Sequence, residues 1–186
     1  MSGAHPTRID LGSGHGIALA NLAFLDIEAS GLGPRSWPIE IGIAMISPSG
    51  TISTQSTLIA PDPEWDPAAW SAESEQVHGI PGAQLYAEGG PAPAVASGVL
   101  MALGHRTVVS DAPEFDERWL GVLLGTLAPT LPVPRFMDFD QLVAKAFEPD
   151  AVNRVYRTLD ALPVPHRAGP DAERLARAFL AGLRDE

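Results

Sequence analysis

The chain of 186 residues contains no cysteine. This absence excludes disulfide bonds, thiolate-bound zinc and a cysteine nucleophile, so any catalysis must use other side chains. A cysteine-free protein is compatible with a reducing compartment, and we expect a cytoplasmic location.

Positive charge is scarce: 12 lysines and arginines face 23 aspartates and glutamates, which gives a formal net charge of −11. A protein that holds a long nucleic acid usually has a basic face. Seven of the twelve basic residues lie between Lys145 and Arg184, where they indicate either a local basic rim or solvated helix faces. If the substrate is a nucleic acid, the acidic balance favours a short single-stranded end.

A long hydrophobic run is also missing. The apolar stretch from Ile17 to Leu25 is too short to span a bilayer, and the polar residues before it do not form a signal peptide. We therefore expect no membrane segment, a flexible leader over residues 1–19 and a single domain over residues 20–186.

The pattern of apolar residues predicts an α/β fold. An antiparallel meander comes first, then an irregular acidic and proline-rich stretch from Pro61 to Pro93, where we expect specificity to lie. Helices and strands alternate after it, so a mixed sheet covered by helices is expected. The predicted strands are Leu22–Ile27, Pro38–Ile46, Thr51–Ile59, Thr107–Ser110 and Arg135–Asp138, and the predicted helices are Pro93–Leu103, Phe115–Leu127, Gln141–Phe147 and Pro170–Leu183.

Two acids in the first strand are the first candidate for chemistry. Asp26 and Glu28 are two residues apart, so they project from one face of the strand while Leu25 and Ile27 point to the other. Adjacent carboxylates in an apolar strand are costly to ionise unless a cation neutralises them. Oxygen ligands of this kind suit Mg²⁺ or Mn²⁺. Alternatively, both acids lie in solvent at a strand end.

Two further groups of polar residues begin predicted helices. Asp116 falls in the first turn after the strand that ends near Ser110, where an acid can bind metal or simply cap the helix. His166 is expected in a loop and Asp171 in the first turn of the last helix. Histidine titrates near neutrality, so this pair can supply a metal ligand and a general base.

The order of these groups resembles the DEDDh 3′→5′ exonucleases, which include the proofreading epsilon subunit of bacterial replicative polymerase, ribonuclease T and oligoribonuclease. The segment Asp26-Ile27-Glu28-Ala29-Ser30-Gly31-Leu32 and the later Ile39-Glu40-Ile41-Gly42 are similar to the first family motif. Val77-His78-Gly79-Ile80 also matches a short family sequence, and His166 precedes Asp171 by five residues. The likeness spans residues 22–183 and selects the histidine branch over its tyrosine sister.

The resemblance implies a ribonuclease H-like fold with a five-stranded mixed sheet flanked by helices. It implies that two Mg²⁺ (or Mn²⁺) ions bind the four carboxylates, that His166 is the general base, and that nucleoside 5′-monophosphates are released from single-stranded DNA or RNA 3′ ends. A homodimer is compatible with it. The metal ligands would be Asp26, Glu28, Asp116 and Asp171, and Ser30, Gly31 and Leu32 would contact the terminal nucleotide; Glu40 and His78 are interpreted as structural.

Two departures from the family pattern stand out. Asp111 occupies a place that is often Asn, and Gly169-Pro170 falls inside the last motif. The alternative of a different class is a non-catalytic ribonuclease H-like binding module. A nucleotide-binding protein that uses the glycines of residues 12–16 is disfavoured, because their spacing differs from Gly-x-Gly-x-x-Gly and they precede the first strand.

Overall fold

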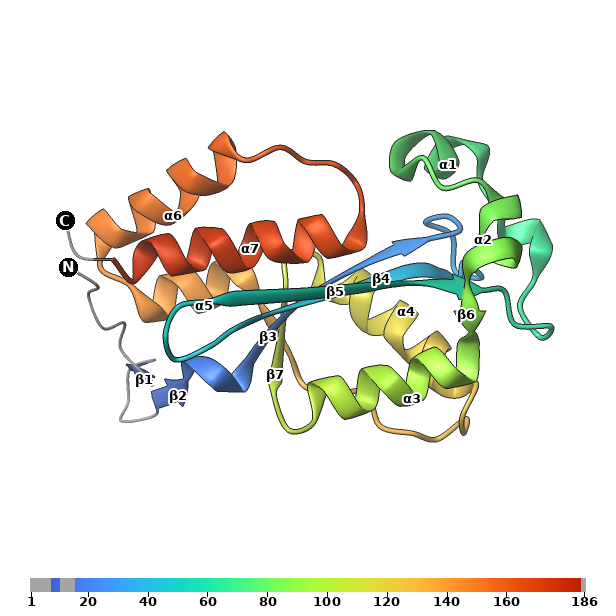
Figure 1. Cartoon of the computed structure of the whole chain (residues 1–186), viewed down its shortest axis with the longest axis horizontal. Helices are drawn as coiled ribbons and strands as arrows, with labels where there is room; N and C mark the ends of the chain where they lie inside the picture. Colours follow the sequence, from blue (N-terminus) through green and yellow to red (C-terminus); the bar gives the residue numbers. More distant parts are fainter. Residues whose placement is uncertain (1–7, 11–15, 185–186) are drawn as a thin grey trace.

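A computed structural model describes residues 8–10 and 16–184 of the chain. Within this part, a six-stranded mixed sheet forms the centre of the molecule, with helices on both faces (Figure 1). The α/β fold predicted from the sequence is therefore confirmed. The sixth strand lies at one edge of the sheet and has only two residues. A strand of this length is too short for an apolar pattern to predict it. In the order of the sheet, the strands are β6 (Gly90–Pro91), β5 (Ile52–Ala60), β4 (Pro38–Ile46), β3 (Leu22–Ala29), β7 (Thr107–Ser110) and β8 (Phe136–Asp138).

The strands β3, β4 and β5 form the antiparallel meander, whereas β7 pairs in parallel with β3, and β8 in parallel with β7. Side chains alternate along β3, as the sequence predicts. Phe24 packs into the core cluster shared with α7 (Ala168–Gly182), while Leu25 and Ile27 pack on the opposite face. The carboxylates of Asp26 and Glu28 therefore lie on the same face of the sheet as α7.

Helices cover each face of the sheet. On the side of α7 lie α5 (Phe139–Ala146) and α6 (Pro149–Ala161). On the other side lie α3 (Ala92–Leu103) and α4 (Pro113–Gly125). The sequence analysis missed α6, although Val155 is fully buried and Val152 and Leu159 pack beside it at helical spacing.

The stretch between β5 and β6, which the sequence indicates is irregular, contains short helices. They are η2 (Pro67–Ala69), α1 (Ala72–His78) and α2 (Gly82–Glu88). The stretch packs through aromatic rings on Trp37, which immediately precedes β4. The ring centroid of Trp65 lies 5.5 Å from that of Trp37 in a stacked arrangement, and the ring centroid of Trp70 lies 5.7 Å from it. Tryptophan packing thus fixes a segment that has little regular structure of its own.

Part of the segment interpreted as a flexible leader has regular structure. The strands β1 (Arg8–Asp10) and β2 (Gly16–Ala18) pair in antiparallel fashion, η1 (Leu19–Asn21) follows, and Ile9 is buried in the core. Residues 1–7 and 11–15 lie outside the described part, and so does most of the glycine-rich run at residues 12–16. Among the described residues, no helix has the length and hydrophobicity needed to cross a membrane.

Candidate active site

Three carboxylates from distant parts of the chain meet at one point. Asp26 and Glu28 on β3 and Asp171 in the first turn of α7 each offer an oxygen, and these oxygens lie within 4.8 Å of one another. All three side chains are half-buried. Carboxylates at this spacing repel each other unless a cation or protons lie between them.

Two glycines allow α7 to begin directly on the sheet. A Cβ atom at Gly42 of β4 would lie 2.1 Å from the carbonyl carbon of Ala168, and one at Gly169 would lie 2.9 Å from the Cβ of Ser56 on β5. Larger residues would push the helix away at both positions. Packing thus explains why a glycine is present at position 169, where the sequence departs from the family pattern. The close approach of α7 to the sheet also brings Asp171 to β3.

Burial and mutual repulsion disfavour the charged forms of these acids. Burial, followed by the charges of Asp116 and Glu28, raises the pKa of Asp26 to about 9. Burial and the charge of Asp171 raise the pKa of Glu28 to about 7. A bound cation would remove this cost by favouring the ionised forms.

The donor set fits a hard divalent cation. Every ligand in the cluster is a carboxylate oxygen, which is the type that Mg²⁺ and Mn²⁺ prefer. In addition, the Oδ1 atom of Asp171 is buried without a hydrogen-bond partner, although buried carboxylate oxygens are normally paired. An unpaired oxygen in the middle of an acidic cluster is available as a ligand.

Asp116 lies beside this cluster rather than within the group of three. It is almost fully buried in the first turn of α4, where its carboxylate accepts a hydrogen bond from the Ser110 hydroxyl at the end of β7. Burial raises the pKa of Asp116 to about 7, and the bond from Ser110 opposes the rise. Asp116 does not cap α4, which was the alternative to a metal-binding role, because Ala112 is the N-cap residue of this helix. Asp111 is exposed beyond β7, within electrostatic range of Asp171 and Arg174.

His166 lies in the loop that joins α6 to α7, as predicted, and its side chain is exposed. Its φ angle is 52°, which makes it the single non-glycine residue with positive φ in the described part of the chain. This left-handed conformation is unfavourable for residues with a side chain and persists only where neighbouring contacts impose it. The His166 ring is not among the groups that the structure brings within 4.8 Å of each other.

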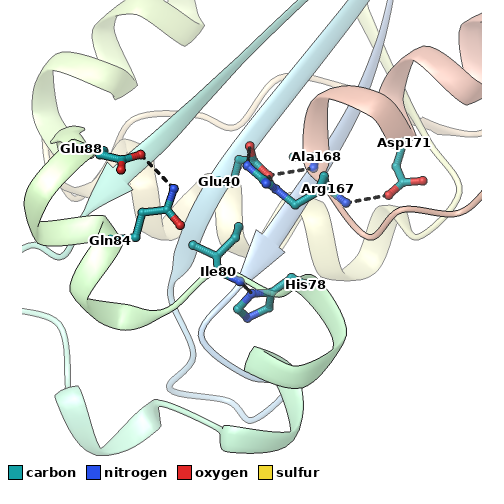
Figure 2. A network of polar contacts seen from close by, with 8 residues as sticks. All are labelled: Glu40, His78, Ile80, Gln84, Glu88, Arg167, Ala168 and Asp171. Carbon is teal, nitrogen blue, oxygen red and sulfur yellow. Dashed lines mark hydrogen bonds and ion pairs between the residues drawn. The ribbon is translucent and has the colours of Figure 1, made fainter.

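The residues that follow His166 are tied to the sheet by a polar network (Figure 2). Arg167 donates two hydrogen bonds to the buried carboxylate of Glu40 on β4, from Nε at 2.9 Å and from Nη2 at 2.8 Å. The Ala168 amide donates to the same carboxylate at 3.0 Å, and the Arg167 amide donates to Oδ2 of Asp171 at 2.9 Å. The loop end is thus held by both β4 and α7.

An apolar groove of about 210 Å³ adjoins the carboxylates. Gly31 and Leu32, two of the residues predicted to contact substrate, line it together with Glu28. Leu32 is 69% exposed, which is unusual for a large apolar side chain. Ser30 behaves differently: it is fully buried, and its hydroxyl accepts a hydrogen bond from the Trp37 amide at 3.0 Å. Its side chain therefore shapes the loop that carries Leu32.

Two groove residues had no functional role in the sequence analysis. Trp119 follows Asp116 by three residues on α4 and so lies on the same side of the helix. His78 accepts a hydrogen bond at Nδ1 from the Ile80 amide at 3.0 Å, and its buried Nε2 has no partner. Burial lowers the pKa of His78, which favours the neutral ring with its proton on Nε2.

Comparison with family models finds no match to this sequence, and comparison with curated proteins finds none either. Solved structures do share its fold. Escherichia coli Exonuclease I in complex with a dT13 oligonucleotide is 14% identical, with a TM-score of 0.62 over 86% of this chain and 40% of that one. A 3′-exonuclease that recognises the histone mRNA stem-loop is 16% identical, with a TM-score of 0.64 over 88% and 82%. The nuclease domain of 3′hExo, a DEDDh family member bound to rAMP, is 16% identical, with a TM-score of 0.60 over 89% and 96%.

These matches confirm, at the level of the fold, the resemblance to DEDDh exonucleases that the sequence motifs indicate. The chain spans 40% of Exonuclease I and 59% of a full-length 3′-exonuclease, but 96% of the 3′hExo nuclease domain. The shared fold therefore has the extent of that domain and covers only part of the larger proteins.

Proposed function

We propose that this chain is a metal-dependent 3′→5′ exonuclease that releases nucleoside 5′-monophosphates from single-stranded DNA or RNA ends. The observation that carries the proposal is the convergence of Asp26, Glu28 and Asp171 within 4.8 Å, on a fold shared with 3′-exonucleases. The raised pKa of Asp26 supports the proposal, because acids with strongly shifted pKa values are typical of functional sites.

Asp26, Glu28, Asp116 and Asp171 would hold two Mg²⁺ or Mn²⁺ ions. When bound, the ions supply Lewis-acid stabilisation of the charge that develops on the scissile phosphate. His166 would accept a proton from the attacking water as general base. His166 immediately precedes Arg167, whose amide donates to Asp171, so the exposed ring belongs to a loop that ends beside the carboxylates.

The apolar groove would take the terminal nucleotide. Glu28 belongs to both the carboxylate cluster and the groove, so a base in the groove places its own phosphate near the carboxylates. Leu32 offers an exposed apolar surface against which a base can pack. A groove of about 210 Å³ suits one nucleotide base rather than a long tract.

The test is degradation of 5′-labelled single-stranded DNA and RNA oligonucleotides with Mn²⁺, Mg²⁺ or EDTA, beside an Asp26→Asn control. We expect a ladder that shortens from the 3′ end, requires metal and is absent in the control. A folded, metal-supplied protein that cleaves neither polymer but still binds oligonucleotides would instead be the non-catalytic binding module. A homodimer and a cytoplasmic location stay predictions.

A further inference from the structure

The loop that carries His166 has an anchor that the sequence motifs alone do not reveal. The bidentate pair between Arg167 and Glu40 joins residues 127 positions apart, and it connects the start of α7 to the second strand of the sheet (Figure 2). The Glu40 carboxylate is 3% exposed, whereas the Arg167 side chain is 39% exposed. The buried acid therefore determines where the arginine lies.

The need for this anchor follows from charge. Glu40 lies directly opposite Glu28 in the β3–β4 register, and two like charges in that position destabilise a sheet. The charge of Glu40 raises the pKa of Glu28, and that of Arg167 lowers it. Arg167 thus offsets the repulsion between the strands, and it does so without a hydrogen bond to Glu28.

The anchor also fixes the peptide after His166. The Arg167 amide bonds to Asp171, the Ala168 amide bonds to Glu40, and Gly42 lets the Ala168 backbone rest on β4. With these groups held, the backbone on the C-terminal side of His166 is fixed, and His166 itself has a positive φ. Arg167 and Glu40 therefore act on the orientation of His166 through the backbone.

We propose that Glu40 and Arg167 are positioning residues for the His166 loop: their ion pair fixes the backbone that follows His166 and so limits the positions that its ring can take beside the carboxylate cluster. This inference rests on the proposed exonuclease function. An arginine that bound substrate directly would act on affinity, whereas a positioning arginine acts on the rate of the bound complex.

The experiment measures kcat, KM and the Mn²⁺ concentration for half-maximal activity in Arg167→Ala, Arg167→Lys and Glu40→Gln. The matched control is Arg177→Ala, which removes an arginine of the same helix whose partner, Glu173, lies away from the carboxylates. Addition of ethylguanidine to Arg167→Ala tests rescue, because the arginine position is open to solvent.

We expect kcat to fall at least about tenfold in Arg167→Ala and Glu40→Gln, with KM and the Mn²⁺ requirement within about threefold of wild type. Arg167→Lys keeps the charge but loses the fork that binds both carboxylate oxygens, so it should recover only part of the rate. Ethylguanidine should restore part of it as well, and the Arg177→Ala control should match wild type.

Three results would overturn the inference: an unchanged kcat in Arg167→Ala, a raised KM with unchanged kcat, or equal losses in the Arg177→Ala control. If Arg167→Ala fails to fold, Arg167→Lys and Glu40→Gln decide between the same outcomes. A wild-type protein that is inactive on every substrate would refute the proposed function instead, which keeps the two failures distinct.

Discussion

The two walls of the candidate site are built by different physics. On the α7 side, the amides of Arg167 and Ala168 donate to the carboxylates of Asp171 and Glu40, and a half-buried ion pair between Arg167 and Glu40 adds to this hold. On the groove side, the Trp119 ring and exposed apolar side chains such as Leu32 form the lining, and the neighbouring stretch between β5 and α1 packs on Trp37 through Trp65 and Trp70. The polar wall should therefore determine the rate of the chemical step, and the apolar wall should determine the affinity for the end of the substrate.

Asp26→Asn, a change on the polar wall, should have the largest effect on the rate. Loss of one carboxylate of the proposed metal site should lower the rate by about 10³-fold or more, since metal-assisted stabilisation would amount to several kcal/mol. The same change should raise the melting temperature in EDTA, because Asn is neutral at every pH and removes the cost of burying an acid whose pKa is raised to about 9 in the folded protein. Single-turnover assays and thermal melts check both parts. Asp160→Asn, an exposed acid on α6, is the control, and equal effects there would refute the assignment.

His166→Gln tests the polar wall without touching a carboxylate. Loss of a general base should lower kcat by about 10² to 10⁴-fold and leave KM nearly unchanged. Steady-state kinetics on a short oligonucleotide measure both constants, with the exposed His105→Gln as the matched control. Undiminished kcat in His166→Gln would remove the histidine from the mechanism.

The acid cluster also predicts how stability depends on pH. The folded protein raises the pKa of Asp26 to about 9 and those of Glu28 and Asp116 to about 7, so the folded state binds more protons than the unfolded state. The contribution of these three acids to stability in EDTA is thus fully present below pH 4 to 5. It is lost as the pH rises toward 9. A loss of about 2 kcal/mol would lower the melting temperature by about 4 to 8 °C.

Mn²⁺ should reverse this trend, because the ion binds the ionised carboxylates and its affinity rises with pH. Thermal melts at pH 5, 7 and 9 with and without Mn²⁺ measure the effect, and Asp26→Asn should flatten it. A melting temperature that is independent of both pH and metal would contradict the cluster as a cation site.

The smallest expected effect lies on the apolar wall. Leu32→Ala removes exposed apolar surface from the groove, which should cost about 1 kcal/mol of binding, or roughly a fivefold rise in KM, with kcat preserved. Met101→Ala on α3 is the control, because Met101 is 84% exposed and lies outside the groove. A fall in kcat without a change in KM would place Leu32 in the chemistry and would blur the distinction between the two walls.

Several features could be predicted because they depend on local pattern. Alternation along β3 placed Asp26 and Glu28 on one face, and the apolar spacing near the C-terminus indicated α7 with Asp171 in its first turn. The α6 helix was missed because Asn153, Arg154 and Arg157 interrupt the apolar pattern of a helix that buries only a narrow face.

Other features depend on contacts between distant segments. Nothing local to Arg167 indicates Glu40 as its partner, and nothing local to His78 indicates that its Nε2 lacks one. The sequence by itself determined the residue types and their places on strands and helices, because backbone periodicity decides which side chains share a face. Only the tertiary structure decided that Gly42 admits α7, that three carboxylates converge and that His166 takes a left-handed conformation, because these depend on how closely packed elements approach one another.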